Sequence, residues 1–164
     1  MQDLFWIQGP GPGRIGVMPR PYGGEGLEDD ILDLRRQEVD TLVSLLERSE
    51  VERYELEREG ELCAAMGIDF LPYPIPDHTA PKDLRSTTLF ARGLAERYRR
   101  SRRILVHCLA GIGRSPTIAG AVLLEAGLPL DEVLRRMSDA RGYPVPEMPE
   151  QLVWLKKYAG QNLE

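Results

Sequence analysis

Apolar residues recur along this chain with two spacings, and segments of the two kinds alternate. Short apolar or alternating runs, which are typical of strands, cover residues 4–7, 14–18, 39–46, 68–75 and 103–106. Apolar positions three to four residues apart predict helices. The first such segment contains Leu27, Ile31 and Leu34, and the others are 47–66, 84–98, 115–127, 130–140 and 152–158. Gly67 is expected to end the second of these helices in the left-handed conformation.

Strands that alternate with helices of this length predict an α/β fold. We expect a central, twisted, partly parallel sheet of about four to five strands with helices on both faces. A chain of 164 residues that is 42% hydrophobic suits one domain, residues 1–164, and no internal repeat divides it. Ligands of such sheets bind beyond the carboxyl ends of the strands, so the residues after 103–106 are the first candidates for a site.

Composition narrows the classes of function. A net charge of -5 argues against nucleic acid as a partner. No apolar run approaches the roughly 18 residues of a membrane-spanning helix, and the first residues lack the pattern of a signal peptide. The two cysteines make no disulfide framework, so we expect a reducing, cytoplasmic setting. The two histidines and two cysteines lack the spacing of metal ligands, so we expect no metal. We also expect no cofactor and a monomer.

Two charged runs stand out from this average. Residues 47–61 are rich in glutamate, and residues 97–103 contain five arginines. We interpret both as solvated helix surface, with the arginines at a helix C-terminus where cations suit the dipole. The arginines precede the strand 103–106 and should lie at the sheet edge opposite the ligand site, which leaves a docking surface as the alternative.

The segment HCLAGIGRSP, residues 107–116, joins the last strand to a helix. Gly111 and Gly113 allow backbone N–H groups to turn inward and surround an anion. Ser115 is the expected N-cap and Pro116 the first helical residue, so the positive end of the helix adds to the same field. Arg114 offers a bidentate fork for two phosphate oxygens. The segment differs from a Walker loop because no lysine follows the glycines.

The same field acts on the thiol of Cys108. A cysteine beside cations and a helix N-terminus ionises easily, so we expect a thiolate at neutral pH. A thiolate beside an anion-binding loop is a nucleophile directed at a bound phosphate. The alternative is a buried structural cysteine in a glycine-rich turn.

The pattern H-C-x-x-G-x-x-R-S at a strand–helix junction resembles the phosphate loop of the cysteine-dependent protein tyrosine phosphatases. Within that superfamily the chain is most similar to small dual-specificity phosphatases of the kinase-associated and regenerating-liver types. The resemblance implies a phosphocysteine intermediate on Cys108, a departing thiolate stabilised by Ser115, and a loop supported by His107, which otherwise is simply packed. It also implies that phosphate is bound by the residues of the loop, namely Leu109, Ala110, Gly111, Ile112, Gly113 and Arg114.

Two further residues follow from the resemblance. The family places a general acid on a loop about 30 residues before the cysteine, and the I-x-D pattern in YPIPDHTAP assigns it to Asp77. A turn-forming aspartate is the alternative. By analogy with regenerating-liver-type enzymes, Gln151 positions the hydrolytic water, or else is an ordinary first-turn glutamine. We read His78 and Lys82 as exposed loop residues.

The loop also bears on the substrate. Phosphoinositide phosphatases of this superfamily tend to carry lysines between the cysteine and the arginine, and this chain has apolar residues there. We therefore expect a phosphorylated protein, with phosphotyrosine first and phosphoserine or phosphothreonine open. The alternatives are a non-protein phosphomonoester, a catalytically weak phosphate-binding or scaffolding module, and arsenate or sulfur chemistry. Arsenate reductases use extra cysteines in relay, and the only other thiol here is Cys63, whose helical spacing with Leu62 and Met66 indicates a core residue. If Cys63 lies near Cys108, it forms a protective disulfide on oxidation.

Overall fold

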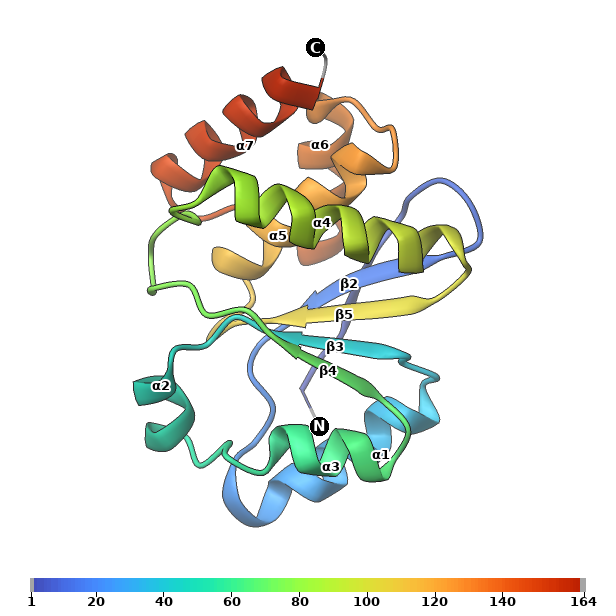
Figure 1. Ribbon diagram of the computed structural model, residues 1–164, viewed down its shortest axis with the longest axis vertical. Coiled ribbons are helices and arrows are strands. Elements are labelled where there is room, and N and C mark those ends of the chain that lie inside the picture. The colour runs from blue at the N-terminus through green and yellow to red at the C-terminus, as the bar shows by residue number, and fades with distance from the viewer. Residues whose placement is uncertain (1, 163–164) are drawn as a thin grey trace.

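A computed structural model of the protein describes residues 2–162, in which the strands form one five-stranded sheet (Figure 1). The strand order is β1-β2-β5-β3-β4. Only β1 runs antiparallel to its neighbour, and the other pairs are parallel. The strands are β1 (Phe5–Ile7), β2 (Arg14–Met18), β3 (Thr41–Ser44), β4 (Asp69–Pro72) and β5 (Arg103–His107). The predicted α/β class with a partly parallel sheet is confirmed.

Helices cover both faces of this sheet. Figure 1 shows α4, α5, α6 and α7 on one face and α1 and α3 on the other, with α2 beside the carboxyl ends of the strands. None of the helices within residues 2–162 is both long and apolar enough to cross a membrane. The helices are η1 (Gly24–Gly26, 3-10), α1 (Leu27–Arg36), α2 (Arg48–Arg53), α3 (Glu59–Ala65), α4 (Leu84–Arg99), α5 (Arg114–Glu125), α6 (Leu130–Arg141) and α7 (Pro149–Asn162).

Alternation along the central strand β5 divides the core in two. Ile104 and Val106 pack into the cluster beneath α4–α7, whereas Leu105 packs into the cluster beneath α1 and α3. This follows from the period of two in a strand, which sends successive side chains to opposite faces. Cys108 belongs to the first cluster, so its thiol faces the α4–α7 side.

The segment 47–66 differs from the single helix that its spacing predicts. It forms α2 and α3, separated by turns in which Glu55 adopts a positive φ of 54°. Leu56, between the two helices, is buried, and burying it bends the chain. Gly67 does follow α3 with φ 76°, as predicted for a residue just beyond a helix end. The break places α2 at the carboxyl edge of the sheet.

Candidate active site

Cys108 leads the loop that joins β5 to α5. Its side chain is buried, with Sγ 3.2 Å from the hydroxyl oxygen of Ser115 and 3.3 Å from the backbone N of Gly111. The prediction that Ser115 caps α5 is wrong. Gly113 occupies the N-cap position, the helix begins at Arg114, and the Ser115 hydroxyl lies in its first turn, facing the sulfur. A thiolate here would accept hydrogen bonds from a hydroxyl and an amide.

The rest of the loop is held from outside through its carbonyl groups. Five consecutive carbonyl oxygens, from residue 108 to 112, each lie within hydrogen-bond distance of a donor outside the loop. The pairs are Cys108 O with His107 Nδ1 (3.2 Å), Leu109 O with Arg20 N (3.1 Å), Ala110 O with Arg141 Nη2 (3.2 Å), Gly111 O with Arg141 Nε (3.2 Å) and Ile112 O with Glu147 N (2.9 Å).

This anchoring directs the loop amides inward. In a planar trans peptide, the C=O of one residue and the N–H of the next point in opposite directions. Outward carbonyls at 108–112 therefore turn the N–H groups of 109–113 toward the loop interior, as the Gly111 N–H contact with Sγ illustrates. Gly111 has φ 76°, and a Cβ there would lie 2.7 Å from a backbone atom of Met18. The glycine is required for this shape.

Arg114 lies beneath the loop with only 1% of its side chain exposed. Its Nη1 and Nη2 donate to the two carboxylate oxygens of Glu50 at 2.9 and 2.7 Å, and Nη1 also donates to the carbonyl of Ile75 at 2.8 Å. Asp77 lies 3.2 Å from Nη2. Within residues 2–162, Nε of Arg114 has no hydrogen-bond partner, which leaves a buried donor for an anion.

This pairing determines the charges of both partners. Burial lowers the pKa of Arg114, but the hydrogen bonds that it donates to Glu50 and the neighbouring anionic groups raise it overall. Burial likewise raises the pKa of Glu50, but the hydrogen bond and charge of Arg114 outweigh this and leave it below its ordinary value. Arg114 is thus a fixed cation with a fixed counterion.

Asp77 lies across the cleft from the loop, as predicted. Its side chain is 39% exposed, and the adjacent His78 is 63% exposed with φ 64°. The cleft has a volume of about 150 Å³. Asp77, His78, Glu147 and Gln151 line it together with Cys108, Arg114 and the loop residues Leu109, Ala110, Ile112 and Gly113.

Gln151 stands between the two loops of the cleft. It is fully buried in the first turn of α7, and its Nε2 donates to the carbonyl of Thr79 at 3.2 Å. Its Oε1 accepts from the backbone N of Met148 at 3.0 Å. A Cβ on Gly113 would lie 3.0 Å from the Gln151 amide, so this side chain touches the phosphate loop directly.

His107 lies on the opposite face of the loop and is fully buried. Its Nε2 is 2.5 Å from a carboxylate oxygen of Glu59, and its Nδ1 faces the carbonyl of Cys108. Both ring nitrogens therefore face oxygen atoms, one on α3 and one on the loop. His107 thus supports the loop and ties it to Glu59 of α3.

Four residues at the site were not predicted from the sequence. Glu50 and Glu59 belong to the run 47–61, and the interpretation of that run as solvated surface is wrong for both. It is correct for others, such as Glu52, whose side chain is 60% exposed. Arg141, at the end of α6, and Glu147, in the α6–α7 connection, hold the loop. A charged residue gives no signal of such a contact in the sequence, because the contact depends on tertiary packing.

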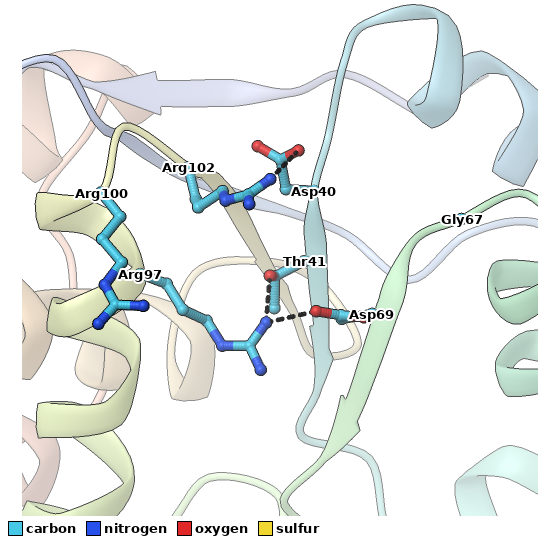
Figure 2. A pocket seen from close by; sticks show the side chains of 7 residues that line it. All are labelled: Asp40, Thr41, Gly67, Asp69, Arg97, Arg100 and Arg102. Carbon is cyan, nitrogen blue, oxygen red and sulfur yellow. Dashed lines mark hydrogen bonds and ion pairs between the residues drawn. The ribbon is translucent and has the colours of Figure 1, made fainter.

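The arginine run lies at the opposite edge of the sheet, as predicted (Figure 2). There Arg97 donates to Asp69 at 2.6 Å and to the hydroxyl of Thr41 at 3.0 Å. The interpretation as solvated helix surface is therefore wrong for Arg97, which ties α4 to β3 and β4. Figure 2 also shows Arg102 facing Asp40, 3.6 Å away, at the start of β3. These arginines line a hollow of about 430 Å³, and the carboxylates of Asp40 and Asp69 partly neutralise their charge. The hollow is separate from the Cys108 cleft.

Both cysteines are free. Cys63 is fully buried in the cluster beneath α1 and α3, on the other side of the sheet from Cys108, as its spacing predicts for a core residue. Burial and the charge of Glu59 raise the pKa of Cys63 to about 12. A thiol of this kind is unreactive. The two positions give no support to a disulfide with Cys108.

Comparisons with known proteins agree with this geometry. PRL-1 phosphatase of Drosophila melanogaster is 28% identical over 130 residues, which are 78% of this chain and 68% of that protein. Cyclin-dependent kinase inhibitor 3 of Rattus norvegicus is 25% identical over 134 residues, which are 80% of this chain but only 63% of the rat protein.

Solved structures extend the comparison to the whole fold. Tk-PTP in its active form has a TM-score of 0.77 at 30% identity and covers 96% of this chain and 97% of its own. Kinase associated phosphatase (KAP), with its catalytic-site cysteine replaced by serine, has a TM-score of 0.86 at 19% identity and covers 98% and 95%. A family model described as "Polymorphic toxin system, DSP-PTPase phosphatase" matches residues 16–128, which contain Asp77, Cys108 and Arg114. The chain therefore belongs to this family of cysteine-based dual-specificity and protein tyrosine phosphatases.

Proposed function

We propose that the protein is a metal-independent phosphoprotein phosphatase that works through a phosphocysteine intermediate. One observation carries the proposal: Cys108 Sγ lies inside a loop whose amides point inward, above a buried arginine and across the cleft from Asp77. Nucleophile, anion site and acid thus converge on one cleft, as a two-step phosphoryl transfer requires.

In the first step, the Cys108 thiolate attacks phosphorus and the ester P–O bond breaks. The loop amides and the free Nε of Arg114 take up charge on the phosphoryl oxygens. Asp77 gives a proton to the leaving oxygen. Asp77 lies on the cleft beside Arg114, 3.2 Å from its Nη2, and so faces the side on which the leaving oxygen departs.

In the second step, water attacks phosphorus, the S–P bond breaks, and Asp77 accepts the proton of that water. The departing sulfur takes the electron pair and is stabilised by the hydroxyl of Ser115 at 3.2 Å. Gln151 contacts both the phosphate loop and the acid loop, and we assign it to orienting this water.

A phosphorylated protein side chain suits the cleft best. At about 150 Å³ the cleft is smaller than the ~300–1,000 Å³ of pockets that enclose whole small molecules. Its interior is apolar at Leu109, Ala110 and Ile112, and an acidic residue, Glu147, lies at its mouth. Among the described residues that line it, Arg114 is the only lysine or arginine, so a headgroup with extra phosphates would find no second one there. Relatives named as phosphatases, including PRL-1 phosphatase and KAP, support the same class of activity. Phosphotyrosine is the expected substrate, with phosphoserine and phosphothreonine to be compared.

Hydrolysis of p-nitrophenyl phosphate in EDTA tests the proposal. The wild-type protein should turn over the ester and leave phosphate on Cys108 after acid quenching, and Cys108→Ser should do neither. Absence of turnover in the wild type, or turnover by Cys108→Ser, would contradict the proposal.

Asp77 and Gln151 have separate tests. General acids contribute ~10²–10⁴-fold, most where the leaving group is basic. Asp77→Asn should therefore lose far more activity on a phosphotyrosine peptide than on p-nitrophenyl phosphate. Gln151→Ala should keep the rapid first phase and accumulate phosphocysteine. Equal losses on both substrates, or no accumulation, would remove these assignments.

A further inference from the structure

Arg141, the last residue of α6, makes an unusual set of contacts on the outer side of the phosphate loop. Its Nη2 donates to the carbonyl of Ala110 and its Nε to the carbonyl of Gly111, each at 3.2 Å. Its guanidinium lies over the ring of Phe5 at 4.0 Å and near the ring of Tyr143 at 5.2 Å. Among residues 2–162 it has no carboxylate partner within ion-pair distance.

These contacts bear on the two peptides at the centre of the loop. With the carbonyls of Ala110 and Gly111 held outward, the N–H groups of Gly111 and Ile112 point inward. The Gly111 N–H already contacts Cys108 Sγ, and the Ile112 N–H is directed into the loop interior, where an anion would bind. His107 is the only other side chain among residues 2–162 that contacts a carbonyl in the run 108–112, and the remaining anchors are backbone N–H groups.

The two aromatic rings fix the guanidinium itself. A cation 4.0 Å from a ring centroid is attracted by the negative face of the ring, and the planar fork keeps its donors in one direction. Phe5 is in β1, and Tyr143 lies two residues after Arg141. Arg141 thus brings together three segments that are distant in sequence, namely β1, the phosphate loop and the end of α6.

We propose that Arg141 is a positioning residue that sets the orientation of the loop amides, and through them the affinity of the loop for a tetrahedral oxyanion and the ionisation of Cys108. The inference rests on the proposed function for its meaning in catalysis, but its physical content is anion binding and thiol reactivity. Both can be measured without turnover.

The test follows alkylation of Cys108 by iodoacetamide, mapped by mass spectrometry, across pH and with increasing inorganic phosphate. Arg141→Met keeps an apolar stem over Phe5 and loses the donors. Arg141→Lys keeps a cation with several donors. Arg135→Met is the matched control, because Arg135 also lies on α6 but is paired with Glu132 and Asp139 on its own helix.

Arg141→Met should need about tenfold more phosphate for half-protection, and its alkylation should require a higher pH. Arg141→Lys should recover most of the phosphate protection and most of the wild-type pH dependence. Arg135→Met should match the wild type in both measurements. Unchanged protection in Arg141→Met would overturn the proposal. So would equal losses in the Met and Lys variants with a parallel fall in Tm, because that pattern indicates lost packing. If the wild type hydrolyses no ester yet shows this Arg141 dependence, the proposed function fails and the positioning role stands.

Discussion

Glu50→Gln removes the counterion that holds the phosphate-binding arginine. Each of the two contacts, at 2.7 and 2.9 Å from Arg114, is a charge-assisted hydrogen bond, and such bonds contribute ~1.5–3 kcal/mol. Glutamine keeps one acceptor oxygen, and the Ile75 carbonyl and Asp77 still contact the guanidinium. We therefore expect a loss of about 2 kcal/mol in the free energy of unfolding, or ~4–8 °C in Tm for a domain of this size.

The pH dependence of this loss has a definite sign. Burial raises the pKa of Glu50, but the hydrogen bond and charge of Arg114 lower it by more than burial raises it. The pKa in the folded protein is therefore below the ordinary value. A carboxyl of this kind adds stability above its unfolded pKa of ~4.3 and loses it as the pH falls through its folded pKa. The Tm difference between the wild type and Glu50→Gln should therefore be full at pH 7 and shrink below about pH 4.5.

Thermal melts from pH 3 to pH 7 measure this difference. Glu52→Gln is the matched control, because Glu52 lies on the same helix and its exposed side chain is paired with the exposed Arg48. It should change Tm little at any pH. Equal shifts for the two variants, or a Glu50→Gln shift that is constant from pH 3 to pH 7, would refute the assigned role of the pair.

Three further substitutions probe the loop and its mouth. Gly111→Ala would place a Cβ 2.7 Å from the backbone at the end of β2, so kcat should fall by ~10² or more, and near-normal kinetics would contradict the required loop shape. Glu59→Gln weakens the contact that holds His107 against the loop, so inorganic phosphate should protect Cys108 from alkylation less well, and unchanged protection would argue against a supporting role for this pair. Glu147→Lys should raise kcat/KM about fivefold for phosphopeptides with an adjacent acidic residue, an effect that salt should reduce, whereas an equal gain on neutral peptides would exclude the charge mechanism.

The parts of the site that the sequence predicts are contiguous or tied to strand ends. Cys108, the two loop glycines and Arg114 lie within seven residues, so local geometry alone brings them together. Asp77 follows the segment of β4 closely, and parallel strands end at the same edge. For these residues, chain connectivity and the common edge of parallel strands are enough to predict that the side chains lie close together, without knowledge of the tertiary packing.

Neither rule applies to Glu50 and Glu59, which are distant in sequence from the loop and do not follow a strand directly. A glutamate-rich run has the same pattern whether its side chains face water or a buried cation, because helix periodicity marks only the apolar face. The turn around Leu56 separates α2 from α3 and directs the two glutamates to Arg114 and His107, on different sides of the loop. Ser115 shows the same limit: its type suits a helix cap, but the glycine before Arg114 takes that position and frees the hydroxyl for the sulfur.

The motif therefore permits the anion site, and the surrounding fold gives it shape. Glycines allow the loop amides to turn inward, but they allow other conformations equally well and lose more entropy on ordering. The inward arrangement persists because each carbonyl from 108 to 112 has an outside donor, supplied by His107, Arg20, Arg141 and Glu147. These donors come from β5, from the segment after β2 and from the end of α6 and its connection to α7. A protein that kept the cysteine, glycines and arginine but lost these donors would retain the motif and bind oxyanions weakly.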